Sequence, residues 1–239
     1  MIGILVTLTI SWILLYLIEK RSILSLGFLP LIKRLKQFVI GFLITAVLCI
    51  GVQSLEALLT SSHLFLNKKL NASLLLSMFW WDFKSVLTEE LIFRGALLYI
   101  LLRRFGSEKG IVVSAVAFGI YHWFSFGIFG NIIPMLFVFI GTGLMGYAWA
   151  LAFSKTHSIF MPIGLHLGWN FTFNTIFSKG PLGDGLLVSS GGNMISDWFS
   201  LISLWGVPIT VLLIVKYLVR LDNGELKETQ LSRRYSLWR

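Results

Sequence analysis

Residues 37–59 read QFVIGFLITAVLCIGVQSLEALL and contain a single charged side chain, Glu56, close to the end of the run. A helix needs about 20 predominantly apolar residues to cross the hydrocarbon core of a bilayer. Comparable runs occupy residues 2–18, 71–102, 111–126, 131–153, 158–177 and 197–219. The sequence therefore predicts an all-α, polytopic helical membrane bundle with about seven transmembrane helices. The run 71–102 is too long for one straight crossing, so we expect it to be strongly tilted or to begin as an interfacial helix over residues 71–81.

The composition excludes a soluble or a disordered protein. Of the 239 residues, 56% are hydrophobic and only 13% are charged, which is about half the charged share of an average soluble domain. No polar linker separates the apolar runs, so we expect residues 1–239 to form one integral membrane domain. Cys49 is the single cysteine, which excludes an internal disulfide framework and a cysteine-based zinc site.

The positive charge is distributed unevenly along the chain. The formal net charge is +9. If seven spans alternate, fifteen of the twenty Lys and Arg residues fall in segments on one side and three fall in loops on the other. The positive-inside rule then places the N-terminus outside and the C-terminus, with a basic tail over about residues 220–239, in the cytoplasm. These residues predict contacts with membrane lipid and no nucleic-acid partner. The short chain and brief loops favour a bacterial inner membrane, and the oligomeric state stays open.

Several ionisable residues lie inside the apolar runs, where each charge costs roughly 2.5–3.5 kcal/mol on insertion scales. Residues 88–95 read TEELIFRG, residues 118–122 read FGIYH, and residues 166–170 read HLGWN. Ionisable residues within a membrane span are candidates for function by default. We therefore take these three segments as the candidate site.

Glu90 and Arg94 are four residues apart, so they lie on one helix face and predict an ion pair. Glu89 points about 100° away from Glu90, so Arg94 cannot easily pair with both carboxylates. We expect Arg94 to keep Glu90 ionised and to leave Glu89 able to exchange a proton, which is what a general base requires. A Glu89 that faces a water-filled cavity without doing chemistry is the alternative.

His122 and His166 lie in different apolar runs, and each taken alone is more often a packed core residue. Asn170 follows His166 by four residues, so the two side chains share a face and could donate hydrogen bonds to an oxyanion. Phe118 precedes His122 by four residues and is placed to pack over its ring. Pairs and ladders of small residues four apart predict close helix packing around these side chains: Ala115 and Gly119, Gly164 and Gly168, and Thr142, Gly146 and Ala150.

Asp82 and Lys84 precede the glutamate pair. They are two residues apart and so do not face each other on a helix. We expect them at the membrane interface, with a position along the route to the site as the alternative.

Together, Glu-Glu-x-x-x-Arg, Phe-x-x-x-His and His-x-x-x-Asn, in this order on separate helices, resemble the CPBP family, the CAAX-protease and bacteriocin-processing family of intramembrane endopeptidases. The resemblance covers residues 74–177, and all three motifs are complete. It implies that Glu89 and His122 activate a water that attacks a peptide carbonyl, and that His166 and Asn170 stabilise the oxyanion. It also implies that Glu90 and Arg94 hold Glu89 in place.

The resemblance implies a hydrophobic, lipid-modified or membrane-proximal peptide as substrate. It favours a glutamate-dependent mechanism without a catalytic metal. If zinc is bound, Glu89, His122 and His166 are the expected ligands. Two other functions stay open: a catalytically silent membrane scaffold or regulator with the same fold, and a proton-coupled transporter. A transporter commonly shows repeated halves, and the sequence contains no internal repeat.

Overall fold

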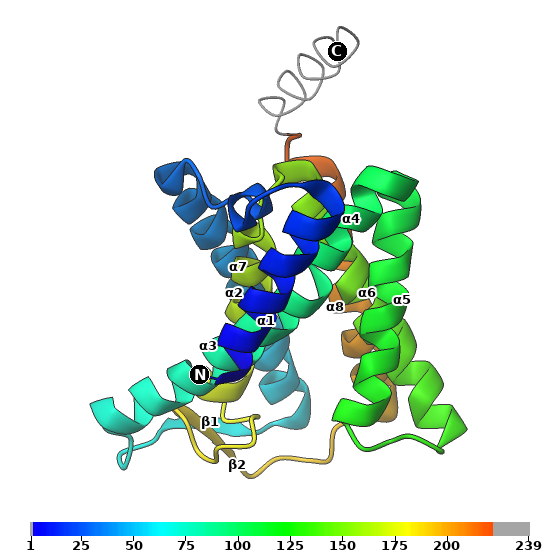
Figure 1. The fold of residues 1–239 in the computed structure, drawn as a ribbon. Helices are drawn as coiled ribbons and strands as arrows, with labels where there is room; N and C mark the ends of the chain where they lie inside the picture. The colour runs from blue at the N-terminus through cyan, green and yellow to red at the C-terminus, as the bar shows by residue number, and fades with distance from the viewer. Residues whose placement is uncertain (1, 222–239) are drawn as a thin grey trace, which may run out of the picture.

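The structure is a computed structural model that describes residues 2–221. It is a helical bundle with one small two-stranded sheet (Figure 1). Its α-helices are α1 (Ile2–Leu14), α2 (Leu31–Thr60), α3 (Ala72–Phe93), α4 (Ala96–Phe105), α5 (Ser107–Ser125), α6 (Ile132–Thr156), α7 (Phe160–Asn170) and α8 (Asp197–Leu218). The other elements are the π-helical turns η1 (Leu15–Glu19) and η3 (Phe171–Ile176), the 3-10 turn η2 (Ile23–Leu26), and the antiparallel strands β1 (His63–Leu66) and β2 (Leu187–Ser190). The basic tail predicted over residues 220–239 falls outside the described residues from 222 onward.

The all-α prediction is confirmed, but the predicted count of seven spans is not. Within residues 2–221, four helical segments are long and apolar enough to cross a membrane: Ile2–Glu19, Ile23–Thr60, Ile132–Thr156 and Asp197–Leu218. The remaining helices are shorter or more polar. Helix α7 has eleven residues and is buried continuously over residues 161–168. It is therefore an interior helix, enclosed by the bundle rather than bounded by lipid.

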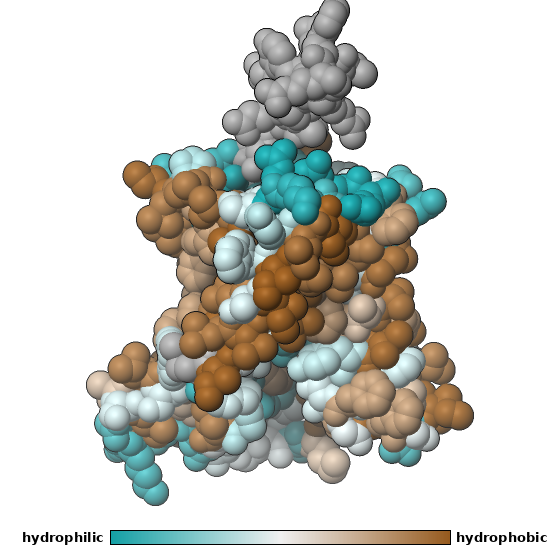
Figure 2. Space-filling view, in the orientation of Figure 1, coloured by the Kyte–Doolittle hydropathy of each residue, from teal (hydrophilic) through white to brown (hydrophobic). Residues whose placement is uncertain are grey.

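The surface of the bundle is apolar where a soluble protein would be polar. Large side chains such as Leu58, Ile132 and Tyr217 are at least 70% exposed, and Figure 2 shows a brown band of hydrophobic residues between two ends that carry the teal, hydrophilic ones. Contiguous exposed apolar surface of this extent marks a membrane-facing surface. The composition and these spans identify an integral membrane protein.

The predicted long run 71–102 is broken rather than continuous. Helix α3 ends at Phe93, Arg94 is its C-cap, and α4 begins at Ala96. The Phe93 carbonyl, which a continuous helix would use internally, accepts a hydrogen bond of 3.0 Å from the Ser114 hydroxyl of α5. At Gly95 an added Cβ would lie 2.1 Å from the Leu91 carbonyl oxygen. The break therefore depends on glycine at this position, and it directs the end of α3 into the bundle.

Glycines let α7 approach α2 closely. A Cβ at Gly164 would lie 2.2 Å from the carbonyl oxygen of Phe38, and one at Gly168 would lie 2.2 Å from that of Phe42. Thr45 of α2 also donates a hydrogen bond of 2.6 Å to the Leu165 carbonyl of α7. The close packing predicted from the spacing of small residues is confirmed here, and it fixes the helix that carries His166.

Candidate active site

Glu90 and Arg94 form the ion pair that their spacing predicts. Arg94 Nη1 lies 3.2 Å from Glu90 Oε1, and neither side chain is exposed. Arg94 Nη2 also donates to the Gly146 carbonyl of α6 at 3.2 Å, and a Cβ at Gly146 would lie 3.1 Å from this nitrogen. The guanidinium group thus joins the end of α3 to α6, and glycine at position 146 leaves room for it.

His166 is bonded to the same carboxylate. Its Nδ1 lies 2.9 Å from Glu90 Oε1, and because an ionised carboxylate only accepts hydrogen bonds, Nδ1 carries the proton. In the neutral ring Nε2 is then an acceptor, and it can donate only when the ring is protonated. The sequence predicted His166 as a donor to an oxyanion and did not predict its bond to Glu90. That bond adds the condition that the ring must be protonated for Nε2 to donate.

Glu89 lies beside this pair and is only partly satisfied. Its Oε1 accepts a long hydrogen bond of 3.4 Å from the Ser85 hydroxyl one turn earlier on α3. Its Oε2 is buried without a hydrogen-bond partner among the described residues and lies 4.0 Å from His166 Nε2. This separation is too long for a direct hydrogen bond and suits a bridge through one small molecule. Glu89 is thus the carboxylate with spare accepting capacity.

Phe118 lies at the centre of the site. Its ring centroid is 4.4 Å from that of His122 and 6.2 Å from that of His166, and Arg94 Cζ lies 4.1 Å from its centroid. The predicted packing of Phe118 on His122 is therefore present. The ring also supplies a cation–π contact to Arg94.

His122 is buried on α5 and is oriented by its own helix. Its Nδ1 lies 2.8 Å from the Phe118 carbonyl, so Nδ1 donates and Nε2 has a free lone pair in the neutral ring. Within residues 2–221, no hydrogen bond or ion pair joins His122 to Glu89. The two residues share a cluster through Phe118 and His166 rather than a direct bond.

Asn170 stands where α7 changes into the π-helical turn η3. It is partly exposed, and its side chain makes no hydrogen bond with the described residues. π-Helical turns occur often at functional sites because the extra residue per turn displaces neighbouring side chains. This irregularity follows directly after the motif His-x-x-x-Asn and was not predicted.

Trp149 of α6 belongs to the site but was not predicted. Its ring stacks on His166 at 4.0 Å between centroids with 22° between planes, and Arg94 Cζ lies 5.1 Å from its centroid. It follows Gly146 by three residues, so the ladder of small residues on α6 was a signal for the helix face that meets the motifs. A single buried tryptophan carries no signal of its own in an apolar run.

Asp82 is buried within the protein rather than solvated. It is 1% exposed and accepts hydrogen bonds from Asn174 and Thr175 of η3. The sequence gives no sign that η3 supplies two donors to this carboxylate. Its interfacial depth stays a prediction.

The site contains a buried ion pair, Glu90 with Arg94, and a second carboxylate, Glu89, beside it. Among residues 2–221, no three His, Cys, Asp or Glu side chains are placed so that they could hold a metal ion. In this arrangement Glu89, His122 and His166 do not form a ligand set of the kind that zinc requires. The arrangement combines a buried carboxylate with spare capacity, two histidines with defined tautomers, and an amide, which is the chemistry of proton transfer next to a hydrogen-bonded oxyanion.

Residues 71–172 match a family model described as type II CAAX prenyl endopeptidase, Rce1-like. The match spans α3 to the start of η3 and contains all seven residues of the three motifs. No curated protein and no solved structure matched the chain. The resemblance to the CAAX-protease family is confirmed by this match, which indicates a hydrolase of the protease class that works within a membrane.

Proposed function

We propose that this chain is a glutamate-type intramembrane endopeptidase that cleaves a hydrophobic, lipid-modified or membrane-proximal peptide. The observation that carries the proposal is the position of Glu89 Oε2, buried without a partner 4.0 Å from His166 Nε2. A water that donates to Glu89 Oε2 would lie beside a carboxylate able to take its proton, with His166 Nε2 close enough to face the carbonyl oxygen under attack. The family match of residues 71–172 supports the same class of reaction.

In the proposed first step, Glu89 accepts a proton from water while the water oxygen forms a bond to the carbonyl carbon of the substrate. His122 orients the water by accepting a hydrogen bond at Nε2, which its Nδ1 bond to the Phe118 carbonyl leaves free. The carbonyl π electrons move to the oxygen, which becomes an oxyanion. General-base catalysis of this kind typically contributes 10²–10⁴-fold.

The oxyanion is stabilised by donors on α7. Asn170 donates through its amide, and His166 donates through Nε2 when its ring is protonated. The negative charge of Glu90 at Nδ1 supports that cation, and Trp149 stacks on its ring. The tetrahedral intermediate then collapses, the C–N bond breaks, and the leaving nitrogen takes the proton from Glu89. No metal ion takes part in these steps.

The burial of the site supports the proposed substrate class. Glu89 is 14% exposed as a side chain, and the other charged groups of the site are less exposed. A soluble polypeptide reaches such a site poorly, whereas a segment already held in or at the bilayer does not need to leave it. Membrane lipid is thus the surrounding medium and a membrane-associated peptide is the partner.

We further propose one membrane domain with seven crossings. Four are the long spans, and the other three are the broken pair α3–α4, helix α5 and the pair α7–η3. The basic segments 19–36 and 103–110 meet at one end of the bundle, where Glu19 pairs with Arg103 and Arg104. The end of α8 lies at the same end, and the start of α1 lies at the opposite one (Figure 1). This arrangement supports the proposal that the end of α8 faces the cytoplasm and the start of α1 faces outside. The bacterial inner membrane is part of the same proposal and rests on the short chain and brief loops.

The test compares peptide termini in membranes of cells that express the native chain, Glu89→Gln, or the matched control Glu108→Gln at equal levels. Glu108 is an exposed carboxylate at the start of α5, away from the site. We expect termini that appear with the native chain and the control and are absent with Glu89→Gln. Termini that are absent from cells without the chain but persist with a folded Glu89→Gln variant would refute the mechanism. Termini that are identical in all three and in cells without the chain would favour the scaffold function.

A further inference from the structure

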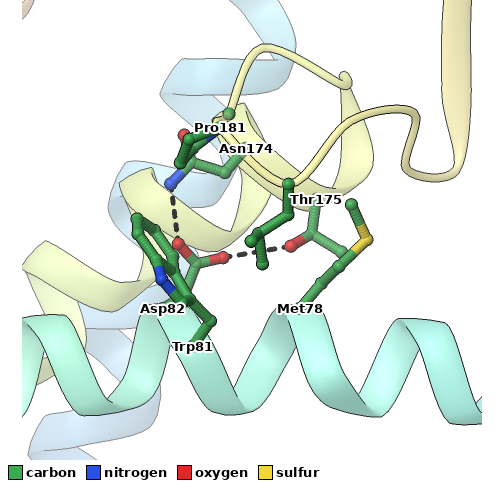
Figure 3. Close-up of a pocket in the computed structure, with 8 residues that line it drawn as sticks. Met78, Trp81, Asp82, Asn174, Thr175 and Pro181 are labelled. Carbon is green, nitrogen blue, oxygen red and sulfur yellow. Dashed lines mark hydrogen bonds between the residues drawn. The ribbon is translucent and has the colours of Figure 1, made fainter.

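A second buried carboxylate lies on the same face of α3 as Glu89. Asp82 precedes Glu89 by seven residues, which is about two helical turns, or roughly 10 Å along the axis. Its Oδ1 accepts a hydrogen bond of 2.6 Å from Asn174 Nδ2, and its Oδ2 accepts one of 3.0 Å from Thr175 Oγ1. Figure 3 shows the carboxylate directed from α3 toward these two side chains. None of the three sequence motifs contains these residues.

Both donors belong to η3, the π-helical turn that follows Asn170. The turn is marked by the Phe177 N–H, which bonds to the Thr172 carbonyl five residues earlier at 3.0 Å. α3 and the α7–η3 segment are thus joined at two levels. Glu90 and His166 form the first level, and Asp82 with Asn174 and Thr175 forms the second. Asn170 lies in the chain between them.

The loop after η3 closes over the second level. The Leu186 N–H donates 2.8 Å to the Thr175 carbonyl, and an added Cβ at Gly185 would lie 1.8 Å from that oxygen. A Cβ at Gly180 would lie 2.5 Å from Asn174 Cβ. Glycines therefore allow the loop to cover the donors, and Asp82 is shielded from water.

We propose that Asp82 is a positioning residue of the protease: by holding Asn174 and Thr175, it fixes the register of η3 and so the direction of the Asn170 amide. The proposal rests on the proposed function. A π-helical turn is rare and interrupts the regular side-chain spacing of an α-helix, so the directions of its side chains depend on tertiary contacts. A buried carboxylate is also a costly way to join two helices compared with apolar packing, which argues for a requirement of geometry rather than of stability alone.

Two substitutions separate hydrogen bonding from charge and from packing. Asp82→Leu fills the space but removes both acceptors. Asp82→Asn is close in shape. Its amide oxygen can accept from the Thr175 hydroxyl, and its amide nitrogen can donate to the side-chain Oδ1 of Asn174 once the Asn174 amide is rotated by 180°. Asp184→Asn, an exposed carboxylate in the covering loop, is the matched control.

The first measurement is of kcat and KM on a synthetic peptide that spans a cleavage site found by the comparison of termini. Because displacement of a catalytic group by about 1 Å can cost 10²-fold in rate, we expect Asp82→Leu to lower kcat roughly 10²-fold with KM within about threefold. Asp82→Asn and Asp184→Asn should keep kcat within about threefold. An unchanged kcat in Asp82→Leu, or an equal loss in Asp82→Asn, would overturn the proposal. So would a loss that only follows the amount of folded protein, measured by thermal unfolding.

The second measurement does not depend on proteolysis. In an Asn170→Cys background, the rate of maleimide labelling reports the surroundings of position 170, while Cys49 is fully buried and serves as the background. We expect Asp82→Leu to increase the rate at least tenfold, because it removes two charge-assisted hydrogen bonds, each of which shifts an opening equilibrium by about one decade or more. Asp82→Asn should restore it. An unchanged rate would refute the positioning role even if cleavage is observed, and a changed rate without any cleavage would count against the proposed function alone.

Discussion

Removal of the Arg94 guanidinium tests whether the charge pair holds the site together. In Arg94→Leu, the Glu90 carboxylate loses its 3.2 Å ion pair, the Gly146 carbonyl loses its donor, and the face of Phe118 loses its cation. Both charged side chains are 0% exposed, so water does not replace the lost partner. Breaking a buried pair in this way costs roughly 3–5 kcal/mol.

His166 reduces that cost only in part. It remains 2.9 Å from Glu90 Oε1, but the second carboxylate oxygen, Oε2, already has no hydrogen-bond partner within the described chain. We therefore expect Arg94→Leu to lower the free energy of unfolding by about 3–5 kcal/mol, despite the remaining bond to His166. For a chain of this size, a loss of 3–5 kcal/mol corresponds to a fall in Tm on the order of 10 °C.

The assay is thermal unfolding of the detergent-solubilised protein, with Glu90→Gln/Arg94→Leu as the matched double variant. The double variant removes the unpaired charge, so it should regain part of the lost stability, about 1 kcal/mol or more. Equal Tm values for the native chain and Arg94→Leu would refute the ion-pair argument. A double variant less stable than Arg94→Leu would show that Glu90 is stabilised chiefly by another partner.

Three further results are expected. Gly168→Ala should destabilise the fold, because its Cβ would lie 2.2 Å from the Phe42 carbonyl oxygen. The control Gly51→Ala, on the open face of α2, should leave the stability unchanged or raise it by up to about 1 kcal/mol. Thermal unfolding in detergent compares the two variants. Trp149→Leu should lower kcat by up to about tenfold, because the stack on His166 is lost. Trp205 stacks on Phe137 instead, so Trp205→Leu should leave kcat unchanged. An equal loss of kcat in both variants would point to general packing. Purified protein incubated with EDTA or 1,10-phenanthroline should keep its activity, and a loss that added zinc restores would contradict the metal-free mechanism.

The sequence predicted several helices well because their extent follows from hydropathy, although it did not predict the break between α3 and α4. The run 197–219, for example, corresponds to α8 from Asp197 to Leu218. It also predicted the Glu90–Arg94 pair and the contact of Phe118 with His122, since both depend only on four-residue spacing within one helix. Contacts of this local kind need no knowledge of which helices are neighbours.

Contacts between helices were harder to predict. The bond from His166 to Glu90 joins residues far apart in the chain, and nothing in either motif says which of two adjacent glutamates the histidine meets. The stack of Trp149 on His166 and the hydrogen bonds from Asn174 and Thr175 to Asp82 have the same origin. Each depends on how α3, α6 and α7 pack against one another, and the sequence does not identify these neighbours.

The geometry of the charge pair explains why two adjacent glutamates are needed. A lone glutamate in this bundle would be bonded by both Arg94 and His166, since they are the nearby donors, and a carboxylate so occupied is a poor base. Glu90 takes both donors through one oxygen. Glu89, turned about 100° away on the same helix, keeps Oε2 without a hydrogen-bond partner in the described chain, at the level of His166 Nε2. Glu90 thus keeps Glu89 free to act as a base. In Glu90→Gln, Arg94 and His166 would turn to Glu89 as the remaining carboxylate. The variant should therefore abolish activity as fully as Glu89→Gln, and it should also weaken the fold.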